Sequence, residues 1–70
     1  MRYRELTRRL KDLGCYQLRA AKGSHRYWHN PITDKVVSIP DWGNKDLRPG
    51  TVRAIIRELG IDRKEFGPIK

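Results

Sequence analysis

The residues of this chain that are best suited to chemistry lie together in the segment Lys22-Gly23-Ser24-His25. A histidine can take up or release a proton near neutral pH, because its unperturbed pKa is about 6.5. A glycine has no side chain, so the backbone N–H groups beside it can approach a phosphate closely. The lysine adds a positive charge. This combination suits proton transfer next to an anionic group, with His25 as the candidate base.

The charge of the whole chain favours an anionic partner. Its 70 residues include 16 Lys and Arg against 8 Asp and Glu, which gives a formal net charge of +8. This excess is larger than solubility requires, so we expect contact with nucleic acid. The candidate RNA-binding residues are Lys22, Gly23, Ser24, Arg26 and Lys45.

An RNA strand would bring its own nucleophile to such a site. The 2′-OH beside a phosphate needs only a base to accept its proton and cations to hold the negative charge that develops. His25 fits the base, and Lys22 or Arg26 fits the cation. The alternative is a strand histidine that packs or makes one hydrogen bond, since no second acid or base accompanies it. Ser24 fits a turn hydroxyl better than a donor to RNA.

Two further residues have reactive side chains. His29 lies four positions after His25, a spacing that would bring both rings to one metal ion on a helix. On a strand the same residues lie about 13 Å apart, too far for one ion. The aromatic neighbours favour a strand, so we expect no metal and no other cofactor. Cys15 opens a predicted strand, and we expect a small buried side chain there.

Three aromatic residues could stack on bases. Tyr27 and Trp28 are adjacent, so on a strand they point to opposite faces; one is expected in the core and the other free to stack. Trp42 lies in a polar loop. A stacking platform and a lid over the edge of the core are equally good interpretations of it.

The elements that must position these residues follow from apolar periodicity. Apolar residues recur at helical spacing, and the flanking residues Gly14, Pro49 and Gly60 start or stop helices. Alternating or aromatic-rich segments predict strands, with the apolar side of the first strand (Tyr16, Leu18, Ala20) making it half-buried. The expected helices are 4–13 and 49–60, the expected strands are 15–20, 24–29 and 35–39, and 62–66 fits one last turn.

This order predicts an α+β fold, α-β-β-β-α, in which two helices pack on one face of a three-stranded antiparallel sheet. Residues 1–70 have room for one domain with a thin core. No apolar run approaches the ~20 residues of a membrane span. Cys15 is the only cysteine, which fits a reducing compartment. We therefore expect a cytoplasmic protein that does not contact a membrane.

Taken in order, these motifs resemble the HicA family of bacterial and archaeal toxins, which are small mRNA interferases. The segments that carry the resemblance are Lys22-Gly23-Ser24-His25, Ile39-Pro40, Gly43-Asn44-Lys45-Asp46-Leu47, Pro49-Gly50-Thr51, Ala54-Ile55-Ile56-Arg57 and Gly60-Ile61.

The resemblance implies a fold like that of double-stranded-RNA-binding domains. It also implies that the chain is the toxin of a type II toxin–antitoxin system, a metal-independent endoribonuclease that cleaves mRNA with His25 as its catalytic residue. A HicB-type antitoxin would cover the active face. Two alternatives remain from the residues themselves: a non-catalytic RNA-binding module of the same fold, and an adaptor for an acidic protein.

Overall fold

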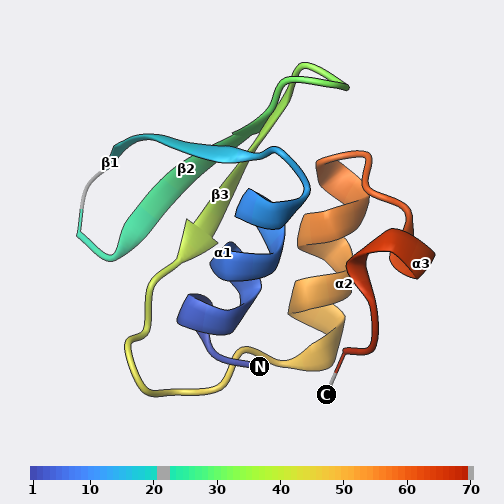
Figure 1. The fold of residues 1–70 in the computed structure, drawn as a ribbon. Coiled ribbons are helices and arrows are strands. Elements are labelled where there is room, and N and C mark those ends of the chain that lie inside the picture. Colours follow the sequence, from blue (N-terminus) through green and yellow to red (C-terminus); the bar gives the residue numbers. More distant parts are fainter. Residues whose placement is uncertain (21–22, 70) are drawn as a thin grey trace.

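The computed structural model describes residues 1–20 and 23–69. Its elements follow the predicted α-β-β-β-α order, which is confirmed (Figure 1). They are α1 (Tyr3–Asp12), β1 (Tyr16–Ala20), β2 (His25–Asn30), β3 (Lys35–Pro40), α2 (Pro49–Glu58) and the short α3 (Arg63–Phe66).

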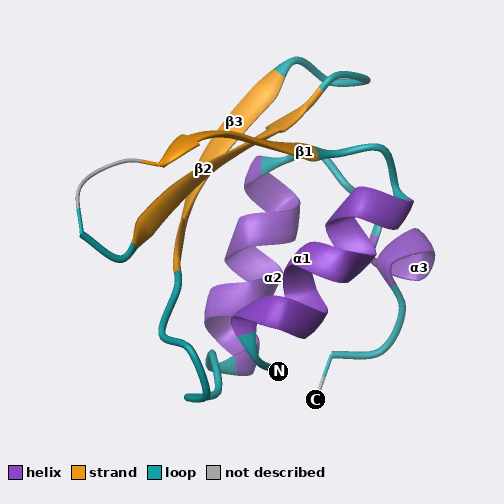
Figure 2. Cartoon of the chain, turned by 60° about the vertical axis from the view of Figure 1, so that its left-hand side comes forward, coloured by secondary structure: helices purple, strands orange, loops and turns teal. Residues whose placement is uncertain are grey.

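The three strands form an antiparallel sheet in the order β1-β2-β3, so β2 is the central strand. β2 and β3 pair without interruption from His25–Pro40 to Asn30–Lys35. The pairing of β1 with β2 shifts between Gln17 and Ala20, as at a β-bulge. Figure 2 shows α1 and α2 on the same side of the sheet, so one sheet face is covered by helices and the other is open.

The hydrophobic core fills the space between the helices and the sheet. Trp28 of β2 is its largest side chain and is 1% exposed. Its indole Nε1 donates a hydrogen bond of 3.1 Å to the hydroxyl of Tyr3 on α1, so the buried N–H is not left without a partner. The other fully buried large side chains are Leu6, Leu10, Ile39, Leu47, Val52, Ile56 and Leu59.

The prediction that β1 is half-buried through its apolar side is wrong. Tyr16 and Leu18 are 47% and 39% exposed. The register explains this, because Gln17 pairs with the inward-facing Trp28. Side chains alternate along a strand, so the residues on either side of Gln17 must face away from the helices.

The helix ends agree with the predictions. Gly14 and Gly60 follow α1 and α2 with φ of 94° and 71°, the left-handed conformation that glycine adopts without strain. Asp62 caps α3 by accepting a hydrogen bond from the backbone N–H of Lys64 at 2.9 Å, which confirms a last turn. Within the described ranges, no helix is long and apolar enough to cross a membrane.

Candidate active site

His25 opens β2 and lies on the open face of the sheet. Trp28 faces the core, so the residues at odd-numbered positions of β2 face away from the helices. The His25 ring is exposed, and its Nδ1 lies 3.3 Å from the hydroxyl oxygen of Ser38 on β3. No hydrogen bond joins Nε2 to the parts of the chain that the structure describes. When Ser38 accepts a hydrogen bond from Nδ1, the lone pair of the imidazole is on Nε2 and is open to a ligand.

The turn before His25 is held by Arg26. Its Nη1 donates to the carbonyl oxygen of Gly23 at 2.7 Å and to that of His25 at 3.0 Å. Gly23 itself has a φ of 62°, which favours glycine there. The Arg26 side chain lies on the helix side of β2, opposite to the His25 ring. Its two hydrogen bonds stabilise the backbone of the turn, and its positive charge stays close to this turn.

A backbone hydrogen bond connects this turn to the loop after β3. The N–H of Asp41 donates to the carbonyl of Ser24 at 2.7 Å. In the same loop the N–H of Lys45 donates to the carbonyl of Trp42 at 3.2 Å. Trp42 is 47% exposed, and with Lys45 it lines a shallow hollow of about 280 Å³. Trp42 is therefore not a buried lid, and its ring is accessible.

The structure brings most of the predicted site residues together. Gly23, Ser24, His25 and Arg26 form one continuous turn and strand start, and the loop of Lys45 is bonded to that turn through Asp41. The Ser24 side chain is exposed and makes no hydrogen bond to any described residue. Lys22, the other predicted contact, lies outside the described residues.

The two adjacent aromatic residues of β2 divide as predicted. Trp28 is in the core, whereas Tyr27 is 44% exposed on the same face as His25. Tyr27 pairs with Ser38 across the sheet, so the Tyr27 ring adjoins the hydroxyl that contacts His25. A base on this face could stack on Tyr27.

A second histidine cluster, which sequence reasoning did not find, lies at the other end of β2. His29 Nδ1 is 2.8 Å from the Tyr16 hydroxyl, and its Nε2 is 2.9 Å from Asp34 Oδ1. Both ring nitrogens are thus engaged. The two histidines are four positions apart on the strand, a separation of about 13 Å, so His29 cannot act on the same phosphate as His25. The contact depends on the β1–β2 register, which spacing along the chain does not reveal.

The described ranges also bear on metal binding and on thiol chemistry. No group of three or more His, Cys, Asp or Glu side chains there is placed to hold a metal ion. Cys15 is 3% exposed, and burial raises the pKa of its thiol. A protonated, enclosed thiol is a poor nucleophile, which agrees with the predicted packing role.

Comparison with known proteins gives one finding. The family model described as the HicA toxin of bacterial toxin–antitoxin systems matches residues 3–61, which includes every element from α1 to α2. Searches of curated proteins and of solved structures returned no match.

Proposed function

This chain belongs to the HicA family, the toxins of bacterial toxin–antitoxin systems, and from that premise we propose that it is a metal-independent endoribonuclease that cleaves mRNA. His25 is the catalytic residue in this proposal. The observation that carries it is the position of the His25 ring: it is exposed on the open sheet face, its Nδ1 contacts Ser38, and its Nε2 bonds to none of the described residues.

The reaction proceeds by attack of the RNA on itself. Nε2 of His25 takes the proton from a 2′-OH as its oxygen attacks the adjacent phosphorus. The bond from the 2′-oxygen to phosphorus forms and the bond from phosphorus to the 5′-oxygen breaks. The leaving 5′-oxygen takes a proton from solvent, from Lys22 or from His25 as it returns its proton. The products are a 2′,3′-cyclic phosphate and a 5′-hydroxyl.

Positive charge and backbone N–H groups stabilise the phosphorane. In this proposal Lys22 and Lys45 contact the phosphates, while the N–H groups at Gly23 and Ser24 approach the scissile group. Arg26 is a positioning residue, because its guanidinium is bonded to the carbonyls of Gly23 and His25. Its charge also adds to the positive potential at the turn.

A HicB-type antitoxin would inhibit this toxin by covering the open face. Tyr16, Tyr27 and Val36 are each more than 40% exposed there, and all three lie on the His25 side of the sheet by strand alternation. An antitoxin that packs on these side chains would bury the His25 ring and exclude RNA.

The test is cleavage of an end-labelled single-stranded RNA in excess EDTA. We expect the wild type to cut and His25→Ala to lose activity by about 100-fold or more, the usual contribution of a general base. His29→Ala is the matched control, because it removes a histidine from the same strand and the same face. It should cut at close to the wild-type rate.

Three outcomes would contradict the proposal in different ways. Equal cleavage by wild type and His25→Ala would remove His25 from the mechanism. Loss of wild-type activity in EDTA would contradict metal independence. If the wild type binds RNA but does not cut it, the chain acts as an RNA-binding module instead.

A further inference from the structure

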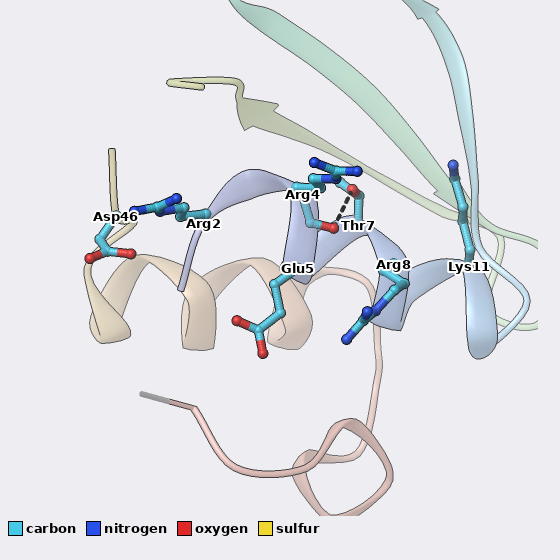
Figure 3. A pocket seen from close by; sticks show the side chains of 7 residues that line it. All are labelled: Arg2, Arg4, Glu5, Thr7, Arg8, Lys11 and Asp46. Atoms are coloured by element: carbon cyan, nitrogen blue, oxygen red, sulfur yellow. Dashed lines mark hydrogen bonds between the residues drawn. The ribbon is translucent and has the colours of Figure 1, made fainter. Parts of the chain in front are cut away.

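A second cationic surface lies on α1, away from the His25 ring. A shallow groove of about 700 Å³ runs over the exposed side of this helix. Figure 3 shows the side chains that line it: Arg2, Arg4, Glu5, Thr7, Arg8, Lys11 and Asp46. Four of these seven residues are cations, and the proposed cleavage reaction uses none of them.

The acidic residues of the groove are already engaged. Glu5 Oε2 forms an ion pair with Arg9 Nη2 at 3.1 Å, and Asp46 Oδ1 lies 3.5 Å from the amino terminus of Met1. Thr7 donates its hydroxyl hydrogen bond to a carbonyl of its own helix, that of Tyr3. The groove therefore has little negative charge left to balance its cations.

The cations of the groove are not neutralised within the described ranges 1–20 and 23–69. There, the side chains of Arg2, Arg4 and Arg8 make no ion pair and no hydrogen bond. Lys11 Nζ lies 5.9 Å from the centroid of the Trp28 ring, a contact that leaves its positive charge intact. An anionic ligand could engage all four without breaking an existing ion pair.

The arrangement of these charges favours a long polyanion over a small anion. Arg4, Arg8 and Lys11 follow one another at i, i+4 and i+7, which keeps them on one side of the helix. At a rise of 1.5 Å per residue they extend over about 10 Å. Figure 3 shows Arg2 at one end of the groove and Lys11 at the other. The charges form a row and do not converge on a point, which suits the repeated phosphates of a nucleic-acid strand.

The start of α1 packs on the helix side of β2, the strand that carries His25. Tyr3, between Arg2 and Arg4, accepts the hydrogen bond from Trp28 on β2. Burial raises the pKa of the Tyr3 hydroxyl, and the charges of Asp41 and Arg26 are close enough to act on it. Arg26 directly follows His25, and Asp41 is bonded to Ser24. An RNA strand that passes from the His25 turn to the helix side of the sheet would therefore meet α1.

We propose that the α1 groove binds the sugar–phosphate backbone of the RNA substrate beyond the scissile bond. This inference rests on the proposed ribonuclease function and extends it: the enzyme holds a single strand several nucleotides long, through phosphates and without base recognition on α1. Substrates too short to reach α1 lose this contact.

The test measures RNA binding in the non-cleaving His25→Ala background. The groove variant carries Arg4→Gln and Arg8→Gln in addition. The matched control carries Arg53→Gln and Arg57→Gln, which remove the same charge from two exposed positions of α2. Fluorescence anisotropy of labelled 4- and 12-nucleotide RNAs is followed over a series of NaCl concentrations, and thermal melting checks that each variant is folded.

For the 12-nucleotide RNA, we expect the slope of log K against log salt to become less steep by about 1.4 in the groove variant, since each lost phosphate contact on a single strand accounts for about 0.7. The slope of the control should change much less, and the 4-nucleotide RNA should bind equally to groove variant and parent.

Two results would overturn the inference. Equal slopes for groove variant and control, with the parent binding RNA well, would reject the groove while leaving the ribonuclease proposal intact. If, in that case, the groove variant loses binding of poly-glutamate while its RNA binding matches that of the control, the groove is a site for an acidic protein. If the His25→Ala protein without further changes does not bind RNA, both the RNA-binding role of the groove and the proposed function are overturned.

Discussion

On β2 the role of each side chain follows from the face of the sheet to which it points, and this face alternates from one residue to the next. His25 and Tyr27 face the open side, whereas Trp28 and Asn30 are buried against the helices, at 1% and 4% exposure. Two-residue alternation thus places reactive and packing groups side by side on one short strand. A one-residue slip of β2 would turn His25 toward the helices and Trp28 toward solvent. The tight burial of Trp28 therefore fixes the orientation of the candidate catalytic ring.

Cys15 provides a residue-level test of this packing. Its side chain is 3% exposed, and burial raises the pKa of the thiol. Because the reactive form is the thiolate, we expect iodoacetamide at pH 8 to label the folded protein about 100-fold or more slowly than the urea-unfolded chain. Mass spectrometry over time measures both rates. Equal rates would mean that Cys15 is accessible in the native state.

At the scale of elements, the β2–β3 turn is attached to the end of α2. The Asn30 side chain donates to the Leu59 carbonyl at 2.8 Å, and the Thr33 hydroxyl donates to the same carbonyl at 2.8 Å. The turn also packs closely on the residue after Leu59, because a Cβ at Gly60 would lie 2.8 Å from Thr33 Cγ2. These contacts satisfy a terminal carbonyl of the helix and align the sheet with α2.

Removing the buried amide should weaken this attachment. In Asn30→Ala the N–H of Ile32, which donates to Asn30 Oδ1 at 3.1 Å, loses its partner, and Leu59 loses one of two donors. We expect the free energy of unfolding to fall by about 1–3 kcal/mol, measured by urea denaturation. Asn44→Ala is the control, since Asn44 is exposed; its effect should stay within about 0.5 kcal/mol. Equal effects would show that the Asn30 contacts contribute little.

Elements also show how far the sequence could predict this molecule. Glycine stops and apolar periodicity locate α1 and α2 to within about two residues, because those are local effects. The contact of His25 with Ser38 and the cluster of His29 with Tyr16 depend on strand register, which is set by packing across the sheet. For the same reason the prediction that the apolar side of β1 faces the core is wrong. One of the two acidic residues that line the α1 groove, Asp46, also comes from a loop distant in the sequence.

For the whole molecule, the dominant feature is unbalanced positive charge. The formal net charge is +8. Among residues 1–20 and 23–69, Glu5 and Asp46 form ion pairs and Asp34 contacts His29, and all three acidic side chains are at least partly exposed. Exposed pairs contribute little to stability, so repulsion among the cations acts against the folded state. The same charge attracts RNA over long distances.

Salt should therefore change folding and RNA binding in opposite directions. Between 50 and 500 mM NaCl we expect the free energy of unfolding to rise, because screening weakens the self-repulsion. Over the same range RNA affinity should fall steeply, since each phosphate contact releases counterions. Urea denaturation and anisotropy of labelled RNA, the latter with His25→Ala, measure the two quantities in matched buffers. A stability that falls with salt would show that attractive ion pairs outweigh the repulsion, and a flat binding curve would show that phosphates are not the main contact.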